Sequence, residues 1–155
     1  MKTILSLLLI FLGQNLFSQP TCDTLAIEKI INKQLKIADK WFDRPFVLSK
    51  SSTPYDTTRN YYQLDSIYNK YYCGKNVKWN DFNVSSKYGK VETDTSKREE
   101  YRLFISTPIF NETMDKCRFV INTHYSEWGG KAMLCFYEKK NKKWKLVKST
   151  LLWVS

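Results

Sequence analysis

The chain has 155 residues, of which 15% are aromatic and only five are glycine, and it carries a formal net charge of +10. This composition is typical of a folded protein and excludes a disordered or low-complexity chain. The sequence contains no phosphate-binding loop, no HExxH zinc motif and no GxSxG nucleophile motif, so no motif specifies an enzymatic reaction. It also lacks nucleic-acid-binding motifs, and nucleic acid is not an expected partner despite the basic charge.

The first residues have the layout of a secretory signal peptide. Lys2 precedes an apolar run over residues 4–12, and small or polar residues follow up to Ser18. Because the run is about half as long as a membrane-spanning helix, we expect residues 1–18 to be cleaved and the protein to be exported, either periplasmic or secreted. Residues 19–155 are then expected to form a single domain, since no linker or repeat divides them. An uncleaved membrane anchor and lipidation at Cys22 are the alternatives.

Two segments of the N-terminal half follow a helical repeat. Residues 23–42 have apolar positions every three or four residues, and Asp23 and Thr24 can cap the first turn. This amphipathic helix is expected to bury its apolar stripe, which consists of Ile27, Ile30, Ile31, Leu35, Ala38, Trp41 and Phe42. A shorter second helix is predicted over residues 61–71, with Gly74 as its stop, although so many tyrosines would also suit a strand.

The segments around the second helix are polar. A short strand is suggested at residues 46–48, and the following serines, threonines and Pro54 indicate a loop. Trp79 and Phe82 are the apolar residues expected to hold the polar segment 75–99 on the body of the protein.

From Tyr101 onward the pattern changes to that of strands. Residues 102–110, 117–125, 131–139 and 144–155 are rich in strand formers with short connections, which predicts an antiparallel meander of about four strands. Pro108 cannot donate to a ladder, so it is expected at an edge or a bulge, and a slip in alternation near residues 148–151 predicts another bulge. Helices first and sheet afterwards predict an α+β fold, with the long helix on one face of the sheet.

The C-terminal half has a distinctive order of features. The motif Ser106-Thr107-Pro108-Ile109-Phe110 is followed by a strand, the Gly129-Gly130 pair, a lysine-rich turn into Trp144, and a closing Trp153-Val154-Ser155. In this order, residues from about 101 to the end resemble a group of small exported proteins of Bacteroidota-type bacteria, mostly of unassigned function. The layout is similar to NTF2-like and cystatin-like folds. The resemblance implies an exported α+β protein, often without the features of an enzyme.

Four cysteines remain after the expected cleavage, namely Cys22, Cys73, Cys117 and Cys135. An even number in an exported chain indicates disulfides. The cysteines form no CxxC motif and the chain has one histidine, so neither a metal site nor any other cofactor is expected.

The hairpin that holds two of these cysteines limits how they can pair. Either of two registers that keep apolar side chains on one face sets Phe119 and Ile121 against Leu134 and Phe136, which places Cys117 and Cys135 on opposite faces and too far apart to bond. The expected bridges therefore join the helical half to the sheet. They are Cys22–Cys117 with Cys73–Cys135, or Cys22–Cys135 with Cys73–Cys117, and the alternative is four buried free thiols.

His124, the single histidine, is the one candidate for general acid–base catalysis, since its ordinary pKa lies near neutrality. The sequence indicates no nucleophile, orienting carboxylate or metal for it; Glu127, three residues away, is an unspecific partner. The strand pattern puts Phe119, Ile121 and Tyr125 on one face and His124 on the other.

Trp128 is the better candidate for contact with a partner, because it stands beside the Gly129-Gly130 pair at the expected tip of a hairpin. Tyr125 and Lys131 flank it and complete the predicted partner-binding set. The alternative is an ordinary turn in which the glycines supply positive φ angles.

Residues 131–148 contain seven lysines and one glutamate. Such a segment suits an acidic protein or an anionic glycan, or it protects a strand edge from aggregation. The sequence therefore favours an exported, non-catalytic binding or interaction module with a basic C-terminal sheet and an unidentified protein or glycan partner. The alternatives are an NTF2-like enzyme with His124 or Tyr125 in a pocket between helix and sheet, and an inhibitor or immunity-type protein.

Overall fold

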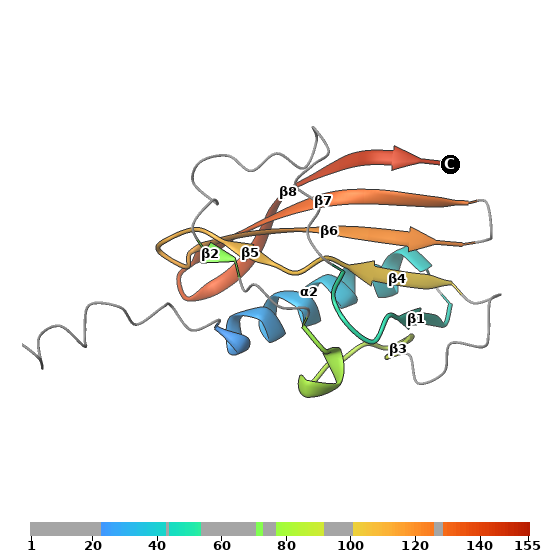
Figure 1. The fold of residues 1–155 in the computed structure, drawn as a ribbon, viewed down its shortest axis with the longest axis horizontal. Helices are drawn as coiled ribbons and strands as arrows, with labels where there is room; N and C mark the ends of the chain where they lie inside the picture. The colour runs from blue at the N-terminus through green and yellow to red at the C-terminus, as the bar shows by residue number, and fades with distance from the viewer. Residues whose placement is uncertain (1–22, 43, 54–70, 73–76, 92–100, 126–128) are drawn as a thin grey trace, which may run out of the picture.

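A computed structural model describes residues 23–42, 44–53, 71–72, 77–91, 101–125 and 129–155. These residues form one α-helix, one short 3-10 helix and a mixed sheet of eight strands, which confirms the predicted α+β class. The helix α2 lies against one face of the sheet (Figure 1). Among the described residues, no helix combines the length and the hydropathy that crossing a membrane requires. The predicted signal peptide lies outside the described residues.

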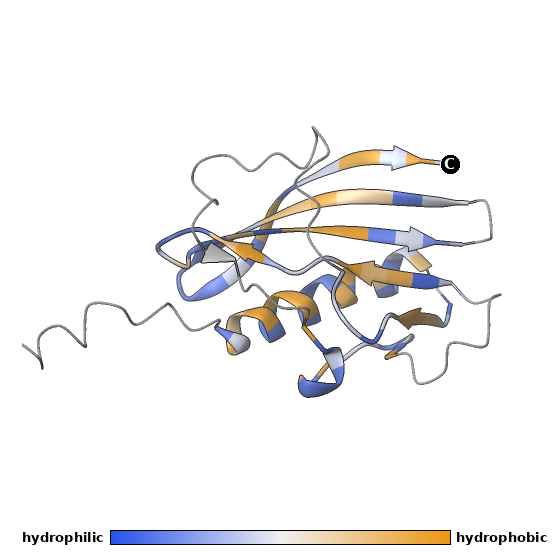
Figure 2. Ribbon diagram, viewed as in Figure 1, coloured by the Kyte–Doolittle hydropathy of each residue, from blue (hydrophilic) through white to orange (hydrophobic). Residues whose placement is uncertain are grey.

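Helix α2 (Thr24–Phe42) begins and packs as its sequence predicts. The carboxylate of Asp23 caps it by accepting a hydrogen bond of 2.9 Å from the backbone N–H of Ala26. The apolar stripe is buried in the core that α2 forms with the sheet, and Figure 2 shows hydrophobic and hydrophilic residues alternating along α2. The exception is Trp41, which is 38% exposed at the end of the helix.

The predicted antiparallel meander forms the larger part of the sheet. Its strands are β4 (Arg102–Ile105), β5 (Ile109–Phe110), β6 (Lys116–His124), β7 (Gly130–Lys140) and β8 (Lys143–Val154). Both β4 and β5 pair with β6, β6 pairs with β7, and β7 pairs with β8, all antiparallel. The turn between β7 and β8 has positive φ at Asn141 and Lys142, which suits a two-residue hairpin loop.

The interruption between β4 and β5 is a bulge, as predicted from Pro108. Ile105 lies opposite Ile121, whereas Ile109 lies opposite Arg118, so one residue of the β4–β5 segment has no counterpart on β6. Ser106 holds this site: its backbone N–H donates to the carbonyl of Val120, and its hydroxyl accepts from the N–H of Val120, both at 2.8 Å. Pro108 is therefore accommodated where the ladder needs no donor.

The bulge predicted near residues 148–151 is replaced by two irregularities on either side of that stretch. Lys148 pairs with Phe136 and Leu146 with Tyr137, which leaves Val147 as an extra residue on β8. Leu151 pairs with Met133 and Trp153 with Ala132, which leaves Leu152 as another. β8 is thus a long strand with a regular central part between two bulges.

The sheet is larger than the predicted four strands because three short strands join it. β1 (Phe46–Leu48) lies parallel to both β4 and β3 (Gly89–Val91), and β2 (Tyr71–Tyr72) pairs with β5. The strand suggested at residues 46–48 is confirmed, whereas β2 and β3 were not predicted. Strands of two or three residues are too short to show an alternating pattern, and their partners are distant in sequence.

The described residues contain one α-helix rather than the two predicted. Most of the expected second helix lies outside the described residues, and its last residue, Tyr71, begins strand β2 opposite Phe110. Tyrosine favours strands, and the edge of β5 offers backbone groups for pairing. At this residue, these two effects outweigh the helical spacing of the apolar residues. Trp79, in the 3-10 helix η3 (Trp79–Asp81), is fully buried against the core as expected.

The predicted register of the β6–β7 hairpin is wrong by one residue. Phe119 lies opposite Cys135 rather than Phe136, and Cys117 lies opposite Tyr137. Cys117 and Cys135 consequently share the face that packs on α2, and both belong to the main core. A one-residue slip exchanges the two faces of a strand, so the error reversed the placement of every β7 side chain relative to β6.

Both described cysteines are free thiols, so the predicted bridges from Cys117 and Cys135 are absent. Each is fully buried between β6, β7 and the helix, where the surrounding side chains are apolar. The proposed partners, Cys22 and Cys73, lie outside the described residues. For the two cysteines that are described, the alternative of buried free thiols holds.

One polar contact crosses the core between the helix and the sheet. The hydroxyl of Tyr137 donates a 2.8 Å hydrogen bond to Oε1 of Gln34, and both residues are fully buried. The amide nitrogen Nε2 of Gln34 has no hydrogen-bond partner. Unlike apolar packing, this bond is directional, and it fixes how α2 lies along β7.

We expect Tyr137→Phe to lower the free energy of unfolding by about 1–3 kcal/mol, because it leaves a buried carbonyl oxygen unpaired. The double variant Gln34→Leu/Tyr137→Phe removes the unpaired groups together and should recover most of that loss. Urea denaturation measures both, with Tyr125→Phe as a matched substitution at a half-buried tyrosine. A double variant less stable than Tyr137→Phe alone would contradict this role.

Because their thiols are buried, Cys117 and Cys135 are expected to make the folded state less stable as the pH becomes alkaline. Burial raises the pKa of Cys117 well above its usual value and that of Cys135 to about 12, and the neighbouring Cys135 raises the pKa of Cys117 further. From about pH 9, the unfolded chain releases these protons while the folded chain keeps them, so stability falls as pH rises.

We therefore expect the free energy of unfolding to decline from about pH 9 toward about pH 12, with each thiol contributing up to about 1.4 kcal/mol per pH unit. A Cys117→Ala/Cys135→Ala variant should show a shallower decline, even though the cavities it creates lower its stability at every pH. Urea denaturation across this range gives the slopes. Parallel slopes for the two proteins would show that the thiols are not the cause.

Candidate functional site

Two of the three predicted partner-binding residues, Tyr125 and Lys131, lie at the same end of the sheet. Tyr125 follows β6, and Lys131 is the second residue of β7. Trp128 lies outside the described residues, so its role stays a prediction. Tyr125 is half-buried and packs against the core, while Lys131 is half-buried near the end of α2.

The end of α2 brings an aromatic ring to this place. The ammonium nitrogen of Lys131 lies 4.9 Å from the centre of the Trp41 ring, which is a cation–π contact. Trp41 belongs to the stripe predicted for the core but stands at its edge. The residue is 38% exposed, so the Trp41–Lys131 pair forms part of the surface.

A second cation–π pair lies at the same end of the sheet. The guanidinium carbon of Arg44 lies 4.9 Å from the centre of the Tyr101 ring, and its Nη1 donates a 3.0 Å hydrogen bond to the Tyr101 hydroxyl. The rings of Tyr101 and Tyr125 have centroids 6.3 Å apart. Phe42 anchors Tyr101 from the core side at 5.9 Å.

These contacts define what we call the tip cluster, which consists of Trp41, Arg44, Tyr101, Tyr125 and Lys131. Its members come from the end of α2, the segment before β1, the residue before β4, the end of β6 and the start of β7. Sequence reasoning found Tyr125 and Lys131 and missed the other three. An exposed tryptophan at the edge of a helical stripe was the one available signal, since the rest of the cluster depends on tertiary pairing.

His124 lies on the opposite face of the sheet from Tyr125, as alternation requires. It is exposed, and its ring makes edge contacts with Phe104 at 5.2 Å and with Trp153 at 6.3 Å. Arg102 is its partner across the β4–β6 ladder. The structure therefore does not bring His124 and Tyr125 into one pocket.

Gly130 serves a different purpose from the one predicted for the glycine pair. None of the described glycines has a positive φ. A Cβ atom on Gly130 would instead lie 2.7 Å from the carbonyl oxygen of Thr123 and 3.1 Å from the Trp153 ring. Gly130 thus allows the close approach of β6, β7 and the C-terminus, where it exchanges two backbone hydrogen bonds with Ser155.

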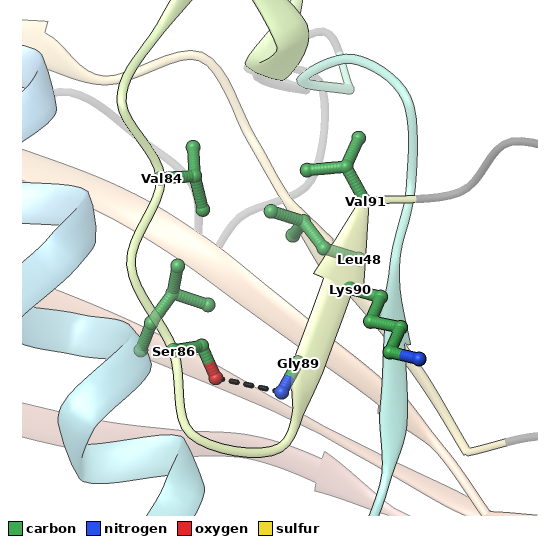
Figure 3. Close-up of a pocket in the computed structure, with 7 residues that line it drawn as sticks. Leu48, Val84, Ser86, Gly89, Lys90 and Val91 are labelled. Atoms are coloured by element: carbon green, nitrogen blue, oxygen red, sulfur yellow. Dashed lines mark hydrogen bonds between the residues drawn. The ribbon is translucent and has the colours of Figure 1, made fainter.

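A cavity of about 240 Å³ lies between α2, strands β1 and β3 and the segment that precedes β3 (Figure 3). Its lining consists of Leu35, Leu48, Val84, Ser86, Gly89, Lys90 and Val91. His124 and Tyr125 do not line it. Between α2 and strands β6 and β7, the interface is filled by buried side chains such as Phe119 and Tyr137.

The polar groups beside this cavity are engaged in holding its wall. The Asp39 carboxylate accepts hydrogen bonds from the Ser86 hydroxyl at 2.5 Å, from the Lys87 N–H at 2.9 Å and from the Tyr88 N–H at 3.1 Å. Partial burial acts to raise the pKa of Asp39, but these hydrogen bonds outweigh it and lower the pKa. The Ser86 hydroxyl also accepts from the N–H of Gly89.

The described residues contain no group of three or more histidine, cysteine or carboxylate side chains placed to hold a metal ion. The polar groups of the cavity wall and the buried Tyr137–Gln34 pair are engaged in hydrogen bonds that hold the fold together. The tip cluster differs because its aromatic and cationic groups are turned partly to solvent. Among the described residues, the tip cluster thus combines partly exposed aromatic rings with positive charges.

The tip cluster contributes little to folding, since exposed cation–π pairs are worth about 0.5–1 kcal/mol each. We expect Arg44→Gln/Lys131→Gln to lower the free energy of unfolding by less than about 2 kcal/mol and to keep the fold. Urea denaturation and near-ultraviolet circular dichroism test this, with Lys29→Gln/Lys36→Gln as a control of equal charge on exposed positions of α2. A much larger loss would assign the cluster a structural role.

Comparisons of the chain with protein-family models, with curated proteins and with solved structures found no match.

Proposed function

We propose that this protein is an exported, non-catalytic binding module that recognises an acidic surface of a partner protein through the tip cluster. The observation that carries the proposal is the assembly of one tryptophan, two tyrosines and two cations at one end of the sheet, from five separate segments. Tryptophan, tyrosine and arginine are the residues that most often dominate binding energy at protein interfaces.

The charge of the cluster supports an acidic partner. Arg44 and Lys131 bring two positive charges, and the cluster itself has no carboxylate. A cation that already lies over an aromatic ring is partly desolvated, so less hydration is lost when a carboxylate approaches it. The chain as a whole has a net charge of +10, which favours encounter with acidic surfaces.

The same geometry favours a protein over a neutral glycan. Sugars stack on the open face of an aromatic ring, and on Trp41 and Tyr101 one face is occupied by the cation of Lys131 or Arg44. Each of these rings therefore presents a positive charge beside its aromatic surface. These complement carboxylates and the apolar rim that surrounds them on a protein surface.

We prefer this proposal to an NTF2-like enzyme because His124, the catalytic candidate, does not lie in a pocket between the helix and the sheet. His124 is exposed, packs between Phe104 and Trp153, and does not line the cavity beside α2. An inhibitor that blocks another enzyme would be a special case of the proposed module, in which the acidic partner surface belongs to that enzyme.

Selection of displayed random peptides against the immobilised full chain tests the proposal. We expect enriched peptides to carry aspartate or glutamate beside an apolar residue, and to bind Arg44→Gln/Lys131→Gln at least about tenfold more weakly, a loss of about 1.4 kcal/mol. Binding should also weaken with salt.

The Lys29→Gln/Lys36→Gln protein separates recognition from general attraction. It has the same net charge as the tip variant and should bind the enriched peptides as the unaltered chain does. Equal weakening by the two double variants would reduce the effect to net charge and end the proposal for the tip cluster.

A further inference from the structure

Strand β8 forms one edge of the sheet over a length of 12 residues. In the part of the chain that the structure describes, β8 pairs with β7 alone, and Figure 1 shows it as the outermost strand. An edge strand presents backbone amides and carbonyls that can pair with a further strand. The length of β8 makes it an unusual edge, since natural proteins often keep such strands short.

The pairing with β7 shows which backbone groups of β8 point outward. Gly130 and Ser155 exchange both of their backbone hydrogen bonds, whereas Lys139 donates away from β8, to the carbonyl of Asp115. Hydrogen-bonded and non-hydrogen-bonded pairs alternate along an antiparallel ladder. Ser149, Leu151 and Val154, the partners of odd-numbered β7 residues, therefore direct their amides and carbonyls away from β7.

Apolar and basic side chains predominate on β8. Val147, Leu151 and Val154 are 45%, 56% and 65% exposed, which makes them three of the five exposed large hydrophobic residues in the described chain. Lys143, Lys145 and Lys148 are exposed as well, and the strand has no acidic residue.

The two kinds of side chain lie on different faces. Leu151 continues the row formed by Ile121 and Met133, on the face that α2 covers further in. Lys148 continues the row formed by Arg118 and Phe136, on the other face, and its ammonium nitrogen lies 5.8 Å from the Phe136 ring centre. A strand added to this edge would therefore meet leucine and valine on one face and lysine on the other.

We propose that β8 receives an added strand from a partner protein, namely an extended segment in which apolar and acidic residues alternate. The apolar residues of the segment extend the row that ends at Leu151, and its carboxylates face Lys145 and Lys148. The backbone groups of Ser149 and Leu151 form the hydrogen bonds, within the regular part of β8 between its two bulges.

Charge argues against a second copy of this chain as the occupant. A second β8 would bring its own three lysines to the edge, and each chain carries a net charge of +10. Like charges opposite one another destabilise a strand pair. An acidic segment turns the same lysines into attractive cross-strand partners.

The part of the edge that would form the hydrogen bonds, at Ser149 and Leu151, is distinct from the tip cluster, although Val154 near the end of β8 lies opposite Lys131. The inference does not depend on the proposed function. It also specifies a different kind of partner structure: an extended strand rather than a folded acidic surface. The two can be tested by different variants of the same full-length chain.

A synthetic peptide with the repeat Glu-Val serves as the probe, and titration calorimetry measures its binding to the full chain. We expect saturable binding that a peptide of the same composition in two blocks, Glu then Val, does not show. Methylation of alternate peptide amides should weaken binding at least about tenfold, because it removes backbone donors that face β8. Undiminished binding of the methylated peptide would overturn the strand-addition mode.

Ser149→Pro tests the edge from the side of the protein. Its amide points away from β7, so proline there leaves the ladder with β7 intact but blocks an added strand. Ser149→Ala is the matched control and should bind as the unaltered chain does, while Ser149→Pro should lose binding about tenfold or more. Urea denaturation confirms that the proline variant is folded, and Lys145→Gln/Lys148→Gln, expected to weaken binding similarly, provides a second variant.

Other sites of binding give distinguishable results. If the peptide binds Ser149→Pro normally but not Arg44→Gln/Lys131→Gln, it occupies the tip cluster and the edge proposal fails. If sedimentation equilibrium shows a dimer of the chain that Ser149→Pro dissociates, the occupant is a second copy and the proposed acidic segment is wrong.

Discussion

The pairing of β6 with β7, which sets Phe119 opposite Cys135, determines which side chains of the sheet face the helix. With this register, Cys117, Phe119 and Tyr137 form the floor on which α2 packs, and the rings of Phe119 and Tyr137 stack at 5.6 Å. A shift by one residue would place Leu134 and Phe136 there instead and turn Tyr137 away from Gln34. The hydrogen bond between Tyr137 and Gln34 is possible only in the observed register, and it fixes the helix along the strand.

The position of the helix then determines which of its side chains contact the two ends of the β7–β8 hairpin. Near one end, Lys33 donates a 2.5 Å hydrogen bond to the carbonyl of Trp144, which ties α2 to the β7–β8 hairpin. At the other end, the last turn of α2 brings Trp41 under Lys131. The helix is therefore both the cover of the core and the element that builds the tip cluster. A shorter or displaced helix would leave Lys131 without its aromatic partner.

The elements with strong periodic signals could be predicted from sequence, and those that depend on tertiary pairing could not. The stripe from Ile27 to Phe42 and the alternation of β6 are long enough to identify a helix and a strand, and Pro108 indicated a bulge by its missing donor. The register of β6–β7 was missed because both faces of β7 carry apolar residues, so alternation did not distinguish them. Both faces are indeed buried: Leu134 and Val120 pack in a second cluster away from the helix.

Of the candidate site, sequence could supply only the residues that neighbour one another along the chain. Tyr125 and Lys131 lie beside a recognisable turn, whereas Arg44 reaches Tyr101 only because β1 lies parallel to β4, a pairing with no local signature. His124 drew attention because it is unique in the sequence, but uniqueness carries no geometric information. In the structure its ring is held between two aromatic side chains on the face opposite the tip cluster.

The positive charges of the β8 lysines can both repel a second copy of the chain and attract an acidic segment. Against a second copy, they repel, and together with the bulges at Val147 and Leu152 they limit edge-to-edge association of a long apolar strand. Against an acidic segment, they attract and leave the central backbone groups available. Bulges along the whole edge would prevent any strand from pairing with it. Lysines on the edge instead select a partner strand by the sign of its charge. The retention of exposed Leu151 and Val154 on such a strand is understandable if discrimination, rather than exclusion, is the purpose of the lysines.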